Sequence, residues 1–291
     1  MAQPPTTVFD RGTEDVGNIV EFGHVNTRVP DQRLATLFYV TGLGLTRDPF
    51  LMTSTDNMWI NVGRCQFHLP SGAAQVVRGV VGLVMPDLDA LERRLTRVRT
   101  QLAGTQFDFS RAGDAVEATS PWGNRMRIHA PDPARFRDTA LGMPYVELAC
   151  QPGTAAGIAR FYREIMGTPA HLEGAAARIP VGLAEELRFV ETEAEQAPYD
   201  GNHIQVTLAD FSGPYRRLLE RGLITEESDE SQYRFLDIVD PSDGRALLRI
   251  EHEVRSMRHP MFARVLVNRN PDINNRNYVP GAETADWAVQ P

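Results

Sequence analysis

The side chains best suited to chemistry are histidines and glutamates at the ends of short apolar stretches. His203 opens one alternating stretch, and Glu191 and Glu251 each end a stretch of apolar residues. One imidazole and two carboxylates form a hard ligand set that suits Fe²⁺, Mn²⁺, Ni²⁺, Co²⁺ or Zn²⁺. Three further histidines lie in the first half of the chain, and three imidazoles suit Zn²⁺: His24, His68 and His129. These residue types therefore favour the chemistry of a divalent metal ion.

The rest of the sequence narrows the choice. It contains no Gly-x-Ser-x-Gly nucleophile motif and no glycine-rich phosphate loop, so hydrolase and nucleotide chemistry have no support. Cys65 and Cys150 are the only cysteines among 291 residues, which excludes a disulfide scaffold and predicts a cytoplasmic protein. The net charge is −8, from 38 acidic and 30 basic residues, so neither nucleic acid nor a membrane is an expected partner.

A fourfold repeat must position these residues. Four alternating apolar stretches run into an acidic or proline-containing turn, and they begin at His24, Val80, Tyr145 and His203. Period-two alternation predicts a strand at each start. A helical pattern follows each strand, and short strands complete each unit. The predicted order within every unit is therefore β-α-β-β-β.

The spacing also predicts how the units are grouped. The interval from His24 to Tyr145 nearly equals the interval from Val80 to His203, which indicates a doublet of doublets. A proline-rich segment at residues 130–134 separates the halves. We therefore expect an N-terminal module at residues 17–133 and a C-terminal module at residues 141–256. Residues 257–291 lack periodicity and are expected to form an irregular tail.

Four such units in two pairs resemble the vicinal oxygen chelate superfamily, which includes glyoxalase I, extradiol ring-cleaving dioxygenases and the bleomycin- and fosfomycin-resistance proteins. The resemblance covers about residues 17–255. The matching segments are His24-Val-Asn-Thr-Arg-Val-Pro-Asp, Phe38-Tyr39 with Gly42-Leu-Gly44, Ser120-Pro-Trp-Gly-Asn, Phe161-Tyr162 with Gly167, and Asp240-Pro-Ser-Asp-Gly with Ile250-Glu251. The resemblance implies an α+β fold of four βαβββ units paired into two vicinal-oxygen-chelate modules, each a half-open cup.

The resemblance further implies where metal ligands lie, because the superfamily takes them from the first and last strand of each paired unit. In the C-terminal module these positions hold Tyr145, Glu191, His203 and Glu251. Tyr145 departs from the His, Gln or Glu of glyoxalase-like members, and Glu147 shares its strand face as a candidate substitute. The expected metal ligands are His203, Glu251, Glu191 and Glu147. The catalytic candidates are Glu251, Glu191, Tyr145 and Glu253.

The N-terminal module is the weaker candidate for a metal centre. It holds His24, His68, Val80 and either Arg127 or His129 at the corresponding positions. Val80 has no ligand atom, and Arg127 would repel a cation. If the ligand position is found by counting residues from the turn after Ser120, it falls on Arg127 rather than on His129. We therefore expect the C-terminal cup to hold the ion and the N-terminal cup to be structural, with His24, His68 and His129 as a second, less favoured ligand set.

Three functions stay open at this point. The resemblance implies first a metal-dependent, glyoxalase-like lyase or isomerase acting on a small substrate with two neighbouring oxygens, where one carboxylate acts as the base. An extradiol-type dioxygenase is the alternative among enzymes, and it requires two histidines and one carboxylate around Fe²⁺. A metal-free small-molecule-binding protein of the resistance type is the third. A homo-oligomer is compatible with each of them.

Overall fold

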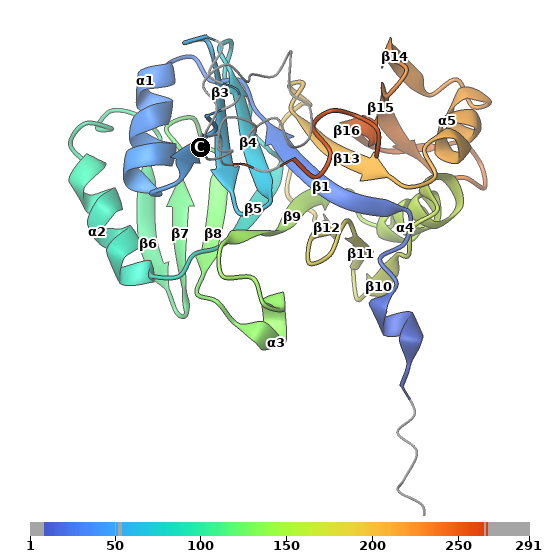
Figure 1. Cartoon of the computed structure of the whole chain (residues 1–291), viewed down its shortest axis with the longest axis horizontal. Helices are drawn as coiled ribbons and strands as arrows, with labels where there is room; N and C mark the ends of the chain where they lie inside the picture. Colours follow the sequence, from blue (N-terminus) through green and yellow to red (C-terminus); the bar gives the residue numbers. More distant parts are fainter. Residues whose placement is uncertain (1–8, 50, 52–53, 265, 267–291) are drawn as a thin grey trace, which may run out of the picture.

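All four β-α-β-β-β units are present in the computed structural model, which describes residues 9–49, 51, 54–264 and 266 (Figure 1). A short 3₁₀ helix, η1, spans Arg11–Glu14 ahead of the first unit. The first unit comprises β1 (Ile19–Asn26), α1 (Gln32–Ala35), the π-helical η2 (Thr36–Gly42), β2 (Thr46–Arg47), β3 (Asn57–Val62) and β4 (Cys65–Pro70). The second comprises β5 (Gly79–Val84), α2 (Leu88–Val98), β6 (Asp108–Ala112), β7 (Ala115–Thr119) and β8 (Arg125–His129).

The second half repeats this order. The third unit comprises β9 (Gly142–Cys150), α4 (Ala155–Phe161), the π-helical η3 (Tyr162–Met166), β10 (His171–Glu173), β11 (Ala176–Pro180) and β12 (Glu186–Glu191). The fourth comprises β13 (His203–Leu208), α5 (Ser212–Leu219), β14 (Ile224–Asp229), β15 (Gln232–Val239) and β16 (Ala246–Ser256). The proline-rich link between the halves forms a short helix, α3 (Pro133–Phe136), which the Asp132 side chain caps by accepting from the backbone N–H of Ala134.

The helices form where the sequence supplies caps and an apolar stripe. Asp87 accepts a hydrogen bond from the backbone of Ala90 at the start of α2, and α2 buries Leu88, Leu91 and Leu95 at helical spacing. In the first and third units the helix passes into a π-helical turn, and a Phe-Tyr pair is buried in the core there: Phe38-Tyr39 within η2, and Phe161-Tyr162 at the junction of α4 and η3. The expected α+β class and the order of elements are therefore confirmed.

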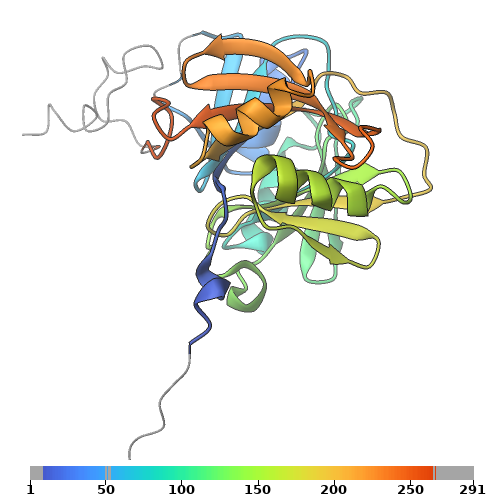
Figure 2. The same ribbon diagram turned by 90° about the vertical axis from the view of Figure 1, so that its right-hand side faces the viewer.

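Within the described residues, the strands form two sheets of eight. Sheet I has the order β14-β15-β16-β13-β1-β4-β3-β2, and sheet II has the order β10-β11-β12-β9-β5-β8-β7-β6. Sheet I thus joins the first unit to the fourth through β1 and β13, and sheet II joins the second to the third through β5 and β9. Figure 2 shows the helices α4 and α5 of the second half on neighbouring sheets.

The sheets differ from our expectation in which units share them. Residues 17–133 and residues 141–256 each contribute one unit to each sheet, so neither range forms a sheet by itself. The reason is that the first strands of all four units carry the same alternating pattern. Such a pattern specifies which face of a strand is buried but leaves open which of several similar edges it pairs with. This change of partner decides which candidate ligands meet.

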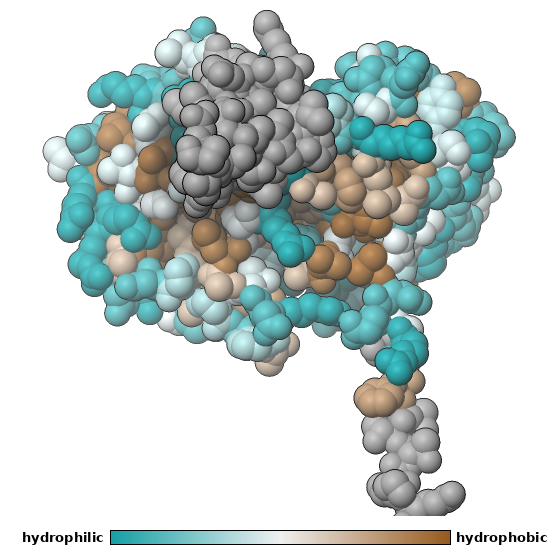
Figure 3. Space-filling model, in the orientation of Figure 1, coloured by the Kyte–Doolittle hydropathy of each residue, from teal (hydrophilic) through white to brown (hydrophobic). Residues whose placement is uncertain are grey.

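The segment after β16 packs against the first unit, as far as the structure describes it. Met261 packs on the pair formed by Leu51 and Trp59, and the buried Arg264 donates to Asp48 Oδ2 at 2.7 Å. The rest of the expected tail lies outside the described residues. In the described part of the chain, no helix has both the length and the apolarity needed to cross a membrane. The face in Figure 3 is hydrophilic along its rim, with apolar side chains gathered toward its middle.

Candidate metal centre

Polar side chains cross sheet I in two adjacent rows. The strand register places Glu251, His203, Asn26 and His68 in one row. The next row contains Arg234, Glu253, Gln205 and His24. Side chains in register on neighbouring strands project to the same side of a sheet. Residues of the first and fourth units therefore share one polar face.

Three histidines from three strands converge on this face. His24, His68 and His203 each offer a ring nitrogen, and these atoms all lie within 4.8 Å of one another. The Nε2 atoms of His24 and His203 are 3.4 Å apart. We call these three residues the histidine triad.

Two histidines of the triad have the protonation state that metal binding requires. Burial holds the pKa of His24 well below its usual value, and burial lowers the pKa of His68 to about 3. Both imidazoles are therefore neutral at neutral pH. Neutral imidazoles are common ligands of divalent transition metals.

Side-chain contacts fix the ring of His68. Trp59 stacks on it with a centroid separation of 3.7 Å. Its Nε2 donates to Asn57 Oδ1 at 2.7 Å, and its Nδ1 accepts from Asn26 Nδ2 at 2.7 Å. This tautomer follows because an amide oxygen accepts and an amide nitrogen donates. An ion bound by His68 must displace one of the two amide contacts.

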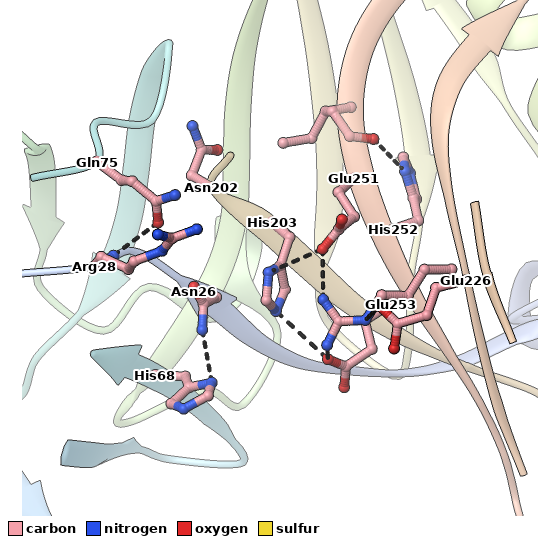
Figure 4. Close-up of polar contacts among 12 residues, drawn as sticks. Asn26, Arg28, His68, Gln75, Asn202, His203, Glu226, Glu251, His252 and Glu253 are labelled. Carbon is pink, nitrogen blue, oxygen red and sulfur yellow. Dashed lines mark hydrogen bonds and ion pairs between the residues drawn. The ribbon is translucent and has the colours of Figure 1, made fainter. Parts of the chain in front are cut away.

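Two carboxylates flank the ring of His203, one at each nitrogen (Figure 4). Glu251 Oε1 lies 3.3 Å from Nδ1, and Glu253 Oε2 lies 3.5 Å from Nε2. Because Nε2 is also the nitrogen that faces His24, Glu253 is on the side of the triad and Glu251 is behind the ring. A carboxylate behind a ligating histidine fixes the ring orientation. The geometry favours Glu253 as an oxygen donor beside the triad and Glu251 as the group that orients His203.

Two arginines neutralise these carboxylates. Arg234 donates from Nη1 to Glu251 Oε1 at 2.5 Å and from Nη2 to Glu253 Oε2 at 2.6 Å. Arg255 Nη2 lies 2.6 Å from Glu253 Oε1. The pKa of Glu253 is well below its usual value, because the hydrogen bond to His203 and the charge of Arg255 outweigh the effect of burial. Glu253 is therefore anionic inside the protein.

The segment that follows β16 closes one side of the centre. A cavity of about 30 Å³ lies between this segment and the sheet, lined among others by His24, Gln66, Arg255 and Arg264. The half-buried Glu21 accepts from Thr207 Oγ1 and from the backbone of Ala263, which ties the segment to β1. The opposite side is more open, since the side chains of Glu251 and Arg234 are 26 % and 20 % exposed.

The structure brings only some of the expected residues together. His203, Glu251 and Glu253 meet in sheet I, but Glu191, Glu147 and Tyr145 belong to sheet II. Glu191 lies opposite Cys150, and its carboxylate accepts from the backbone N–H of Ala155 at the start of α4. The expected ligand set of His203, Glu251, Glu191 and Glu147 is therefore corrected. His203 and Glu251 lie in sheet I, whereas Glu147 and Glu191 lie in sheet II.

Sheet II holds a different residue set at the equivalent places. Its register pairs Gly82 with Arg127 and Tyr145, as Asn26 pairs with His68 and His203 in sheet I. Arg127 rather than His129 therefore occupies the position equivalent to His68. Glu186, not Glu191, lies opposite Tyr145 as Glu251 lies opposite His203. His129 Nε2 forms a hydrogen bond of 2.9 Å with Tyr145 Oη. His129 therefore belongs to sheet II, whereas His24 and His68 belong to sheet I.

Tyr145 occupies in sheet II the register position that His203 occupies in sheet I. Its ring lies under the guanidinium of Arg188, 3.8 Å from the centroid, and over the backbone of Gly82. A Cβ atom on Gly82 would be 2.3 Å from the ring. We expect Gly82→Ala to lower the free energy of unfolding by about 1–3 kcal/mol through overpacking. Urea denaturation measures it, and wild-type stability would contradict this packing.

A matched background tests the cause of that loss. In a Tyr145→Ala protein the ring is gone, so Gly82→Ala should then cost much less than it does beside the tyrosine. An equal cost in both backgrounds would assign the effect to the backbone of β5 instead.

The sequence did contain a signal for the triad. His24 and His203 occupy the same position of their units, and His68 ends the unit that His24 begins. The sequence pattern did not reveal that the first unit pairs with the fourth in one sheet. The roles of Asn26, Asn57 and Arg234 were not foreseen at all, because they depend on cross-strand register.

The overall arrangement occurs in known structures, although no family model and no curated protein matches the sequence. A "putative dioxygenase" from Bacillus subtilis matches with a TM-score of 0.56 at 15% identity, over 93% of this chain and 94% of that chain. Glyoxalase I from Zea mays matches with a TM-score of 0.54 at 12% identity, over 81% of this chain and 92% of that chain.

The chain has the vicinal oxygen chelate fold. At these identities the likeness concerns the fold alone, and this fold hosts several chemistries. Within the vicinal oxygen chelate fold of this protein, the described residues form a histidine cluster suited to a metal on sheet I.

Proposed function

We propose that the protein is a metal-dependent enzyme that binds one divalent ion on His24, His68 and His203, with Glu253 as an oxygen ligand. The convergence of three imidazoles beside a buried carboxylate is the observation that supports it. This nitrogen and oxygen set fits Fe²⁺, Mn²⁺, Ni²⁺, Co²⁺ or Zn²⁺. When bound, such an ion supplies a Lewis acid that binds and polarises two neighbouring oxygens of a small substrate.

The residues around the triad support proton transfer, as in a glyoxalase-like lyase or isomerase. Glu251 lies on the open side of the centre, between His203 Nδ1 and Arg234. Besides orienting His203, this partly exposed carboxylate is the group that we assign as the base for removal of a C–H proton next to a substrate oxygen. Arg234 neutralises Glu251 and Glu253 together, which stabilises two anions close to each other.

An extradiol-type dioxygenase is a second candidate, and one observation favours it. Such enzymes require two histidines and one carboxylate, and the triad with Glu253 contains that set. Tyr145 lies in sheet II, so its departure from histidine does not affect this set. Oxygen uptake with catechols would support this candidate, whereas exchange of a substrate C–H proton with solvent would support the lyase or isomerase. A cytoplasmic location and a homo-oligomeric state stay predictions.

Protein purified without added metal and then titrated with Co²⁺ is expected to bind one ion per chain. Visible absorption of the bound ion gives the stoichiometry, and elemental analysis identifies any ion carried from the cell. Saturation at one equivalent supports the centre. Failure to bind Co²⁺, Zn²⁺ or Fe²⁺, together with no metal in the purified protein, would contradict the proposal and leave the metal-free binding protein in its place.

A further inference from the structure

Sheet II contains an open groove on the face that corresponds to the polar face of sheet I. The groove has a volume of about 370 Å³, within the range of about 300–1,000 Å³ that small-molecule sites occupy. It lies over β5 to β9, and five charged side chains line it: Asp108, Glu117, Arg125, Arg127 and Glu147. None of them takes part in the candidate metal centre.

The equivalent place in sheet I is closed. Val80 lies opposite Glu147 in sheet II as His24 lies opposite Gln205 in sheet I. Beside His24, the segment after β16 leaves a cavity of only about 30 Å³. The place that this segment fills on sheet I is therefore hollow on sheet II.

Three of the five charged side chains in the groove already have partners. Arg127 donates from Nε and from Nη2 to Glu117 Oε1, at 3.1 Å and 2.5 Å. Asp108 Oδ1 lies 3.6 Å from Nη1 of Arg99, which does not line the groove. These three charges are therefore balanced within the protein.

Arg125 and Glu147 are the two that remain. Neither side chain forms a hydrogen bond or an ion pair with another residue in the described part of the chain. The charge of Glu147 acts on Arg127 only from beyond ion-pair distance, and Arg127 is held by Glu117. The groove therefore offers one cation and one anion that the protein does not pair.

The strand register separates these two charges by one strand. Val80 on β5 lies opposite Glu147 on β9. On its other side, β5 pairs with β8 in a register that brings Arg125 beside Val80. Neighbouring strands are about 4.8 Å apart, so the two side chains rise from backbones about 10 Å apart. They form no ion pair across this interval, but a small molecule with both charges can contact each of them.

A zwitterion matches this arrangement better than an ion of one sign. A guanidinium binds a carboxylate through two parallel hydrogen bonds, and a carboxylate binds an ammonium group through charge-assisted hydrogen bonds. A ligand with a single charge would leave one of the two protein groups without its counter-charge. Val80 and the half-buried Phe109 add apolar surface to the same groove, which suits an apolar side chain.

We propose that the sheet II groove is a second binding site, and that it takes a zwitterionic amino acid with an apolar side chain. Arg125 binds the carboxylate of the amino acid, and Glu147 binds its ammonium group. The apolar side chain lies against Val80 and Phe109. This site needs no metal ion and does not rest on the function proposed for sheet I.

The test uses the full chain and isothermal titration calorimetry with three probes of similar shape. L-leucine carries both charges, 4-methylpentanoate lacks the ammonium group, and 3-methylbutylamine lacks the carboxylate. The proteins are wild type, Arg125→Gln and Glu147→Gln. The matched control is Arg33→Gln, because Arg33 on α1 is exposed and does not line the groove. A fifth protein, His203→Ala, separates the groove from the metal centre, since an amino acid can also chelate a metal ion.

We expect wild type to bind leucine about 10-fold more tightly than either single-charge probe. This is the lower end of the range for hydrogen bonds to a charged group, because Arg125 is exposed. Arg125→Gln should weaken leucine and 4-methylpentanoate about 10-fold and leave 3-methylbutylamine unchanged. Glu147→Gln should weaken leucine and 3-methylbutylamine to the same extent and leave 4-methylpentanoate unchanged. Arg33→Gln and His203→Ala should bind leucine as wild type does.

Four results would overturn the inference. The first two are the absence of leucine binding to wild type and an equal affinity for leucine and the single-charge probes. Loss of leucine binding in His203→Ala would assign the amino acid to the metal centre instead. Equal weakening of all three probes in Arg125→Gln and Glu147→Gln would give these side chains a structural role and contradict their assigned contacts. Each variant reports on one charge, so either one alone decides the matter if the other fails to fold.

Discussion

Replacing His203 by alanine is expected to lower the affinity for a divalent ion at least about 100-fold. The loss of a group that merely orients a ligand costs about 10- to 100-fold, and His203 is itself the central donor of the triad. Its Nε2 is 3.4 Å from His24 Nε2 and 3.5 Å from Glu253 Oε2, so this nitrogen lies next to both a second candidate nitrogen ligand and the candidate oxygen ligand. Titration with Co²⁺ or Zn²⁺ against a chelator of known affinity measures the change.

A histidine of the other sheet is the control for that experiment. His129 is also buried, burial lowers its pKa to about 4, and it bonds to Tyr145 rather than to the triad. His129→Ala should therefore leave metal affinity at the wild-type level. If both variants bound the ion like wild type, the triad would not be the centre. If His129→Ala alone lost the ion, the centre would belong to sheet II.

Replacing Asp48 by alanine is expected to lower the free energy of unfolding by about 3–5 kcal/mol, the cost of removing one partner from a buried ion pair. The Asp48 carboxylate is fully buried and accepts from Arg264 at 2.7 Å, from Gln66 at 2.8 Å and from the backbone of Leu51 at 3.1 Å. Without it, the Arg264 guanidinium stays charged in a site that is 2 % exposed. Urea denaturation monitored by circular dichroism measures the loss.

Two further variants of this protein serve as controls for that measurement. The double variant Asp48→Ala with Arg264→Met removes both charges and should be less destabilised than the sum of the two single variants. Glu117→Ala breaks the ion pair with Arg127, whose side chains are both about half exposed, and should cost no more than about 1 kcal/mol. A cost for Asp48→Ala as small as that for Glu117→Ala would mean that the C-terminal segment contributes little to stability.

The sequence specified the units well because each one is local. The alternation that starts at His24, Val80, Tyr145 and His203 and the apolar stripe of Leu88, Leu91 and Leu95 are set by residues close in the chain. The same alternation turns His252 away from the polar face, where its ring stacks on Phe235 and accepts from the Tyr162 hydroxyl. Such patterns report which face of an element is buried.

The candidate centre was only half predictable for the same reason. The assignment of Glu191 depended on counting along one strand, whereas the register with β9 places Glu186 opposite Tyr145. His24 lies next to His203 because the first and fourth units share a sheet. Four similar first strands do not encode that choice of partner locally. Long-range pairing therefore decided the residues of the site, although short-range patterns had identified each histidine.

The pairing of the first unit with the last has a consequence for biosynthesis. Sheet II uses a continuous stretch, from β5 to β12, so all its strands have been made before β13 begins. In sheet I, by contrast, β1 is made first but gains its neighbour β13 only when the fourth unit has left the ribosome. Until then β1 offers an open edge of the kind that pairs with foreign strands. A nascent chain arrested before β16 would hold a complete sheet II, while His24 and His68 would lack Glu253, so the full candidate ligand set would form only after the synthesis of β16.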